Sequence, residues 1–136
     1  MPFPTRAEYE SLIYELAEKH SEIKESTLRL YSTSALTAIM EGEVLLSNGL
    51  KLHVMEVLDF KDQRIVNYSY TIYRGEEKVR WYDPQPHPDN PALAKTFPHH
   101  YHADPDIKHN RLPAHAISFT EPNLETLISD CLKMIN

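Results

Sequence analysis

Cysteine and long apolar runs are scarce in this sequence. Its 136 residues include one cysteine, Cys131, so no disulfide can form within the chain, and a reducing cytoplasm is the default compartment. No apolar stretch approaches the roughly 20 residues that a membrane-spanning helix needs. The N-terminal residues Met1–Glu8 also lack the basic segment and apolar run of a secretory signal. These absences predict a soluble, cytoplasmic protein with no membrane contact.

An excess of positive charge is also absent. The chain has 14 Lys and Arg against 20 Asp and Glu, a net charge of -6, which argues against nonspecific nucleic-acid binding by the whole surface. Residues 60–115 differ from the rest, because they carry 8 basic against 7 acidic side chains. Only this section could present a neutral to positive face to an anion. The length predicts a single domain, residues 1–136, with a core that needs no disulfide or metal.

Two amphipathic helices are predicted, one near each end of the chain. Thr5 and Glu8 have the spacing of a capping box, in which each side chain bonds the other residue's amide. Behind them, a helix of about four turns is predicted to end near His20, with an apolar stripe of Tyr9, Leu12, Ile13, Leu16 and Ala17. The second helix is predicted over residues 122–135, with a stripe of Leu124, Leu127, Ile128, Cys131, Leu132 and Ile135.

Between these helices the apolar period changes to two, which predicts strands. Asn48-Gly49 predicts a hairpin, because both residues tolerate positive φ. The predicted strands are residues 26–30, 36–46, 50–58, 64–73 and 78–82. Five prolines within residues 84–98 then predict a stiff loop. The predicted fold class is α+β: an N-terminal helix, a curved antiparallel sheet of about five strands, a long His/Pro-rich loop and a C-terminal helix.

Glu56 interrupts the alternation of the third predicted strand. It shares a face with the apolar residues of that strand, so its carboxylate would point into the core and would have to be paired or protonated. One interpretation is a bulge or strand end that lets Glu56 reach water. The other is that the concave face of the sheet holds Glu56, Tyr68 and Tyr70 beside a substrate site.

Histidine is concentrated in residues 80–115, which hold six of the eight histidines in the chain. The ordinary histidine pKa of about 6.5 lets the side chain accept and donate protons near neutral pH. Two histidines could therefore act as general base and general acid on a phosphodiester, with Arg80 or Lys95 stabilising the developing charge. A different interpretation is that the histidines pack and stack in a protein-interaction loop without catalysis.

Metal binding is the third interpretation of these histidines. His99, His102 and His87, together with Asp83 or Glu56, offer the imidazole and carboxylate ligands that transition metals bind. The His-x-x-His spacing does not decide between metal binding and acid/base chemistry, because two such residues in a loop can adopt many geometries. All three interpretations stay open at this point.

The histidine-rich segment resembles the signature of a known protein family. Asp83, Pro86-His87 and the Thr-Phe-Pro-His-His-Tyr-His sequence of residues 96–102 are similar to the signature of the TumE family of toxin–antitoxin proteins. The resemblance extends over roughly residues 40–105. Two positions depart from the signature, since Pro88 replaces a second histidine and Tyr101 replaces a lysine that would contact phosphate.

The resemblance implies a toxin that acts inside the cell and is neutralised by a cognate antitoxin. Cleavage of RNA is an expectation drawn from the histidine chemistry and from analogy with other small toxins that cleave RNA. RNA and a second copy of the chain, in a homodimer, are therefore expected partners besides the antitoxin.

The expected site residues follow from the motif. His99 and His102 are the expected acid/base or ligand pair, with His87 as the third imidazole and Asp83 as the group that orients one of them. The expected substrate contacts are Arg80, Tyr68, Tyr70 and Glu56. The catalytic interpretation needs no cofactor, whereas the alternative places one transition-metal ion at the histidine cluster.

Overall fold

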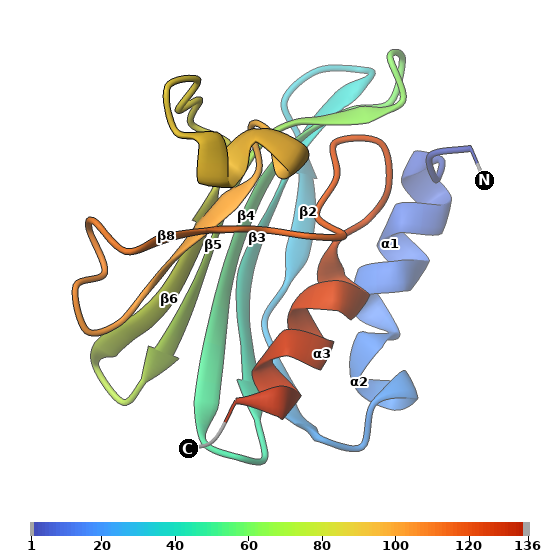
Figure 1. Cartoon of the computed structure of the whole chain (residues 1–136). Coiled ribbons are helices and arrows are strands. Elements are labelled where there is room, and N and C mark those ends of the chain that lie inside the picture. The colour runs from blue at the N-terminus through green and yellow to red at the C-terminus, as the bar shows by residue number, and fades with distance from the viewer. Residues whose placement is uncertain (1, 135–136) are drawn as a thin grey trace.

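The computed structural model describes residues 2–134 and arranges them as an antiparallel sheet with helices against one of its faces (Figure 1). The helices and the inward-facing strand residues share one apolar core. No helix within the described residues is long and apolar enough to cross a bilayer. The α+β class predicted from the two apolar periods is confirmed.

The N-terminal helical segment begins at the predicted capping box. The Thr5 side chain accepts a hydrogen bond from the Glu8 amide, and the Glu8 carboxylate accepts one from the Thr5 amide. Helix α1 spans Arg6–Tyr14 and α2 spans Leu16–Lys19. Glu15, with φ -98° and ψ 1°, separates them, so the single helix of about four turns that we predicted is two shorter helices.

The sheet is larger than the five strands predicted, because eight strands join it within residues 2–134. All strand pairs are antiparallel, in the order β1-β3-β4-β5-β6-β7-β8, with β2 also paired to β3. The strands are β1 Ile23–Ser26, β2 Arg29–Ser32, β3 Thr37–Leu46, β4 Leu50–Asp59, β5 Arg64–Arg74, β6 Glu77–Asp83, β7 His100–Ala103 and β8 Arg111–Pro113.

The additional strands come from two places. The predicted strand at residues 26–30 divides into β1 and β2 around Thr27 and Leu28, which pass close over Gly42 of β3. Strands β7 and β8 form in the histidine-rich segment, which we predicted as loop up to His102 and beyond. Both are too short for their alternation to stand out in the sequence.

The His/Pro-rich connection between β6 and β7 spans residues 84–99 and keeps some local structure. Pro91–Thr96 form a 3₁₀ helix, η1, and the Asn90 side chain accepts a hydrogen bond from the Ala92 amide at its start. Buried Leu93 holds this turn against the molecule. The connection is therefore an ordered loop that contains a short helix, and its prolines predict that it is stiff.

Strand β5 departs from regular alternation near its start. A register shift opposite Val57 and Leu58 leaves Val66 of β5 without a partner in the ladder, since Val57 pairs with Asn67 and Leu58 pairs with Ile65. Val66, two residues before the buried Tyr68, is 48% exposed. The extra residue is a β-bulge, and it turns the start of β5 so that Ile65 faces the core.

The C-terminal helix α3 spans Leu124–Lys133. Most of its predicted apolar stripe is buried, but Leu132 is 38% exposed, and Ile135 lies outside the described residues. The buried side chain of Asn123, just before the helix, accepts a hydrogen bond from the Ser118 amide and donates to the Tyr70 hydroxyl. These contacts attach the start of α3 to β5.

Candidate functional site

Three ionisable side chains converge where β6 and β7 pair. Asp83 is the last residue of β6 and lies opposite His100 of β7, and Trp81 lies opposite His102. Because side chains alternate along a strand, Trp81, Asp83, His100 and His102 project from the same face. This face is opposite the one that packs against the helices, where Tyr82 and its β7 partner Tyr101 point.

The three side chains form a close set, called here the Asp83 cluster (Asp83, His100 and His102). His100 Nε2 lies 3.3 Å from Asp83 Oδ1, and His102 Nε2 lies 3.3 Å from Asp83 Oδ2. The two Nε2 atoms are 3.2 Å apart. All three side chains are buried, with exposed fractions of 1% for His100, 5% for His102 and 10% for Asp83.

The other imidazole nitrogens of the cluster contact the backbone. His100 Nδ1 lies 3.1 Å from the Pro98 carbonyl oxygen, and His102 Nδ1 lies 3.2 Å from the Lys108 carbonyl oxygen. A carbonyl oxygen can only accept, so each Nδ1 carries the proton. Asp83 is held in a similar way, since its Oδ1 accepts a hydrogen bond from the Gln85 amide at 2.8 Å.

Two open hollows flank the cluster and share Pro86 in their walls. The sheet hollow lies on the helix-free face and includes Met55, Ser69, Trp81 and Asp83. The loop hollow lies beside the connection after β6 and is lined by Pro86, His87, Pro88, Asp89, Asn90 and Arg111. Asp83 lines the sheet hollow, so the cluster opens to the surface there. The loop hollow contains no cluster residue but lies next to the cluster.

His87 and Arg111 connect the loop hollow to the cluster. The His87 ring packs edge-on against the His100 ring, with 4.9 Å between the centroids. Arg111 of β8 pairs with His102 and so projects from the same face. Among the described residues, no hydrogen-bond partner lies against Arg111 Nε. Desolvation and the nearby Arg111 charge lower the pKa of His87.

His99, expected to pair with His102, projects to the other side of the strand. Its Nδ1 contacts the Tyr68 hydroxyl at 2.5 Å, and its ring lies 4.6 Å from the Phe119 ring. Burial, together with the neighbouring His100, lowers the pKa of His99. The structure therefore brings together His102, Asp83 and His87 of the expected catalytic set, and separates His99 from them.

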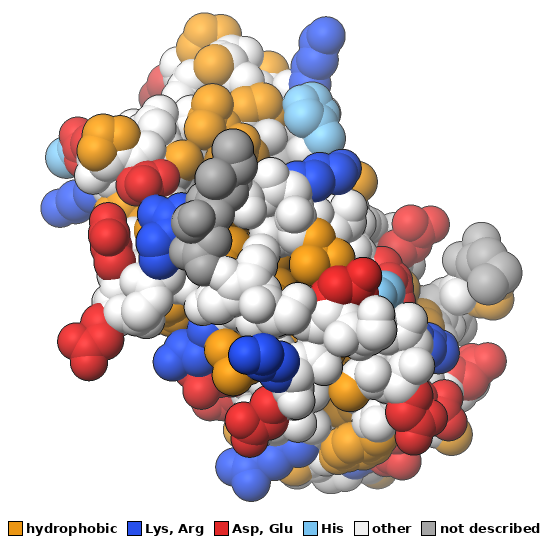
Figure 2. Space-filling view, turned by 90° about the horizontal axis from the view of Figure 1, so that it is seen from below, with side chains coloured by type: hydrophobic (Ala, Val, Ile, Leu, Met, Phe, Trp, Pro, Cys, Tyr) orange, Lys and Arg blue, Asp and Glu red, His pale blue; other side chains and the backbone are white. Residues whose placement is uncertain are grey.

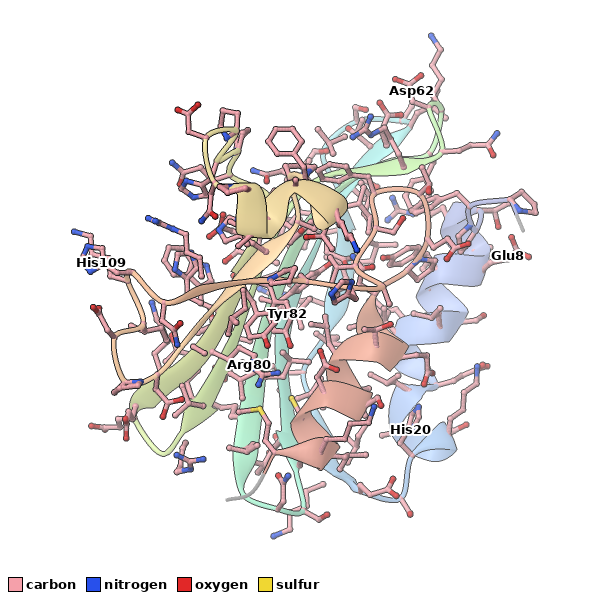
Figure 3. The ribbon with its side chains drawn as sticks, viewed as in Figure 1. Glu8, His20, Asp62, Arg80, Tyr82 and His109 are labelled. Carbon is pink, nitrogen blue, oxygen red and sulfur yellow. The ribbon has the colours of Figure 1, made fainter. Side chains whose placement is uncertain are left out.

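Arg80 also lies away from the cluster. It donates a hydrogen bond to the Tyr82 hydroxyl at 3.3 Å and sits over the Tyr101 ring, 4.5 Å from its centroid. The Tyr82 hydroxyl in turn donates to Asp130 of α3 at 2.7 Å. Figure 3 shows Arg80 and Tyr82 on the side of the sheet that faces α3, whereas His109 lies at the far end of the β7–β8 turn.

Glu56 and Tyr70, two expected substrate contacts, are part of the core. The Tyr9 and Tyr70 hydroxyls donate hydrogen bonds to the two carboxylate oxygens of Glu56, which is 0% exposed. Tyr68, the third expected contact of this group, stacks on Tyr70 with 4.7 Å between ring centroids. Burial raises the pKa of Glu56, against the lowering effect of the two hydrogen bonds. Glu56 neither sits in a bulge nor reaches water.

His100 and Arg111 are members of this region that the sequence did not predict. A signal for His100 was present, because His100 and His102 are two positions apart, and a strand places such residues on one face. Reading residues 100–103 as a strand would have grouped these two histidines and excluded His99. Arg111 carries no such signal, since its place depends on the pairing of β7 with β8.

One face of the molecule, seen from below relative to Figure 1, mixes both signs of charge (Figure 2). Figure 2 shows one face with Lys and Arg side chains interspersed among Asp and Glu, and no broad area of a single sign. This fits the net charge of -6. Anion binding would therefore depend on local groups such as Arg111 and His87.

Comparison with known proteins gives one family. The family model described as "Toxin TumE" matches residues 13–135 of this chain. The match extends on both sides of the segment, roughly residues 40–105, that carries the resemblance in the sequence. Searches of curated proteins and of solved structures gave no significant match.

Proposed function

The chain belongs to the TumE toxin family, whose members act in toxin–antitoxin systems, and on this premise we propose that it cleaves RNA at the Asp83 cluster. The observation that carries the proposal is the convergence of Asp83, His100 and His102 between two open hollows. A cognate antitoxin is the partner that the family implies. RNA is the target that the site chemistry favours.

The cluster has the features of a reacting centre. Imidazole and carboxylate groups in mutual contact beside a surface hollow are the side chains from which acid/base sites are built. Trp81 stacks on His102 with 4.7 Å between centroids, and this fixes the orientation of that ring. Both imidazoles are also oriented by backbone carbonyl groups. Groups fixed in this way lose little freedom when a substrate binds.

The loop hollow supplies the groups that a phosphodiester needs. Arg111 can neutralise the non-bridging phosphate oxygens, because its guanidinium carries a permanent positive charge. In the cleavage step, the 2'-hydroxyl oxygen attacks phosphorus as its proton leaves to the cluster, and the bond to the 5'-oxygen breaks. His87 borders the hollow, and in this proposal it donates the proton that the departing oxygen takes up. The products are a 2',3'-cyclic phosphate and a 5'-hydroxyl.

The test uses the purified full chain with end-labelled RNA. We expect the wild-type protein to produce cyclic-phosphate ends, and His102→Ala to lower the cleavage rate by at least about 100-fold, because it removes a group that acts in the reaction. His109→Ala is the matched control, since His109 is 67% exposed and pairs with Asp106 at 3.2 Å, away from the cluster. Its rate should equal that of the wild type.

Two results would contradict the proposal. The first is undiminished cleavage by a folded His102→Ala variant, which would move the activity away from the cluster. The second is an absence of cleavage by the wild-type chain on any RNA from the cell in which it arrests growth. That second result would favour a toxin that acts by binding a partner.

A further inference from the structure

We propose that Asp83, His100 and His102 bind one divalent transition-metal ion. The ligand atoms are Nε2 of both imidazoles and a carboxylate oxygen, and they lie within 4.8 Å of one another. Imidazole and carboxylate together suit ions such as Zn²⁺, Co²⁺ and Ni²⁺. The inference concerns binding alone, and it stands whether or not RNA is the substrate. If the ion is bound, the lone pairs of His100 and His102 are used as ligands, and the imidazoles themselves would not accept the proton in the proposed cleavage step.

The spacing of the ligand atoms matches that of a small coordination site. A zinc ion holds imidazole nitrogen at about 2.0–2.1 Å, and tetrahedral ligands at this radius lie about 3.3 Å apart. The two Nε2 atoms are 3.2 Å apart, and each lies 3.3 Å from a different Asp83 oxygen, Oδ1 for His100 and Oδ2 for His102. The side chains therefore hold the ligand positions with little need for movement.

The hydrogen bonds of the cluster leave its centre without a donor. Each Nδ1 donates to a carbonyl oxygen, of Pro98 for His100 and of Lys108 for His102, so in the neutral rings both Nε2 atoms carry lone pairs. These lone pairs face each other and the Asp83 carboxylate, which also can only accept. Three acceptors in contact repel one another unless a positive charge lies between them.

Protons supply that charge less well than a metal ion. A single added proton on one Nε2 can donate to the other Nε2, 3.2 Å away, but leaves both Asp83 oxygens facing the rings at 3.3 Å without a donated hydrogen bond from them. Two added protons would place two N–H groups against each other at 3.2 Å. A divalent cation accepts lone pairs from all three groups at once.

The surroundings of the cluster are those of a metal site. Metal-binding histidines usually donate their other ring N–H to a carbonyl or carboxylate group, which fixes the tautomer. Both histidines do so here, and the Gln85 amide fixes Asp83. Three protein ligands leave room for a water molecule or a substrate oxygen, as in catalytic zinc sites. Asp83 lines the sheet hollow, which gives the ion a path to the site.

The experiment measures binding without RNA. The full chain is freed of metal with a chelator, dialysed, and titrated with Zn²⁺ by calorimetry and with Co²⁺ by visible absorption. We expect one ion per chain and the absorption bands of a low-coordinate Co²⁺ site. We expect His102→Ala and Asp83→Asn to weaken Zn²⁺ binding by at least about 100-fold, since each removes a direct ligand. Asp83→Asn keeps the shape of the side chain.

The control is again His109→Ala. His109 and Asp106 form a second histidine–aspartate contact, but both side chains are exposed, at 67% and 66%. If Zn²⁺ binds the surface nonspecifically, loss of His109 will reduce binding as much as loss of His102. Unchanged binding by His109→Ala, with loss in His102→Ala and Asp83→Asn, supports the proposal.

The proposal is overturned if the folded, metal-free wild-type chain binds less than one ion per chain at micromolar Zn²⁺. It is also overturned if Asp83→Asn and His102→Ala bind as tightly as the wild type. The wild-type titration decides even if a variant does not fold. RNA cleavage by a chain that binds no ion at the cluster would overturn this inference alone, whereas metal binding without cleavage would overturn only the proposed function.

Discussion

Glu56 is a carboxyl group inside the core, and its neighbours determine its charge. Two tyrosine hydroxyls, from Tyr9 of α1 and Tyr70 of β5, donate to it, and Asn123 donates to the Tyr70 hydroxyl at 2.9 Å. None of these groups carries a positive charge to offset an ionised carboxylate. Burial therefore dominates and raises the pKa. The residue joins the N-terminal helix, the sheet and the start of α3 through polar contacts.

This network predicts a pH-dependent stability. Because the folded-state pKa of Glu56 lies above its ordinary value of 4.5, the protonated carboxyl contributes stability that is fully present below pH 4.5 and is lost as the pH rises through the raised pKa. Glu56→Gln keeps a neutral side chain at every pH. We expect the free energy of unfolding of the wild type, relative to this variant, to fall with rising pH in urea titrations. A difference that stays constant from pH 4 to pH 8 would contradict the assignment.

Two adjacent histidines at the start of β7, whose side chains make different contacts, give a sharp comparison. His100 belongs to the Asp83 cluster, whereas His99 contacts Tyr68 and Phe119. We expect His100→Ala to abolish both RNA cleavage and growth arrest, and His99→Ala to lower cleavage by less than about 10-fold, because only His100 contacts the other cluster residues. Equal losses in the two variants, both folded by circular dichroism, would contradict this division of roles.

At the scale of elements, β3 depends on a glycine. Thr27 and Leu28, between β1 and β2, cross so close to Gly42 that a Cβ there would lie 2.5 Å from the Thr27 carbonyl oxygen. The φ of Gly42 is also 152°. Thr27 is fixed in place by hydrogen bonds with Glu43, from its amide to the Glu43 carbonyl and from the Glu43 amide to its hydroxyl, both at 2.9 Å.

We expect Gly42→Ala to lower the free energy of unfolding by at least about 3 kcal/mol, from overpacking and backbone strain together. Gly75→Ala is the control, because Gly75 also has a positive φ, 62°, but has nothing within 4 Å of its Cβ position. Its cost should be about 1 kcal/mol, from the backbone alone. Denaturant titration of both variants measures the difference, and equal costs would show that the close approach is not rigid.

Helix α3 gives a second comparison at this scale. Leu127 is fully buried, whereas Leu132, which we predicted on the same apolar stripe, is 38% exposed. We expect Leu127→Ala to cost about 2–5 kcal/mol, since it leaves a cavity in the core. Leu132→Ala should cost less than about 1 kcal/mol. Thermal unfolding of the two variants checks whether α3 packs by the face described here.

The elements also explain what the sequence could predict. Long alternating runs predicted β3, β4, β5 and β6, and the capping box at Thr5 predicted where α1 begins. Strands β1, β2, β7 and β8 are four residues or fewer, so their pairing with neighbours determines them more than their own pattern does. The histidine motif lies in the segment that contains the Asp83 cluster. Its grouping of His99 with His102 did not anticipate that β7 begins at His100 and that the His99 side chain contacts Tyr68 and Phe119 instead.

At the scale of the molecule, the sheet order places β4 in the interior. It pairs along its whole length with β3 on one side and β5 on the other, and its inward residues are buried. Strand β8 has three residues and lies at the edge after β7. The stability of the sheet is therefore expected to fall from β4 towards β8.

Hydrogen exchange can test this gradient. We expect the amides of β4 to exchange only through global unfolding, and the amides of β8 to exchange at least about 100-fold faster, through local opening of the edge. Mass spectrometry of peptides from the exchanged chain resolves the two strands. Equal protection in β4 and β8 would mean that the sheet opens as one unit.

The connection between β6 and β7 begins directly after Asp83 and ends directly before His100, two residues in contact with each other. The contact adds to the pairing of the same two residues in the β6–β7 ladder, so side chains and backbone together close the sixteen-residue connection into a ring. Loss of Asp83 would leave the backbone pairing and remove the side-chain contact. A change at this one residue is therefore expected to alter the cluster and to loosen the ends of the loop at the same time.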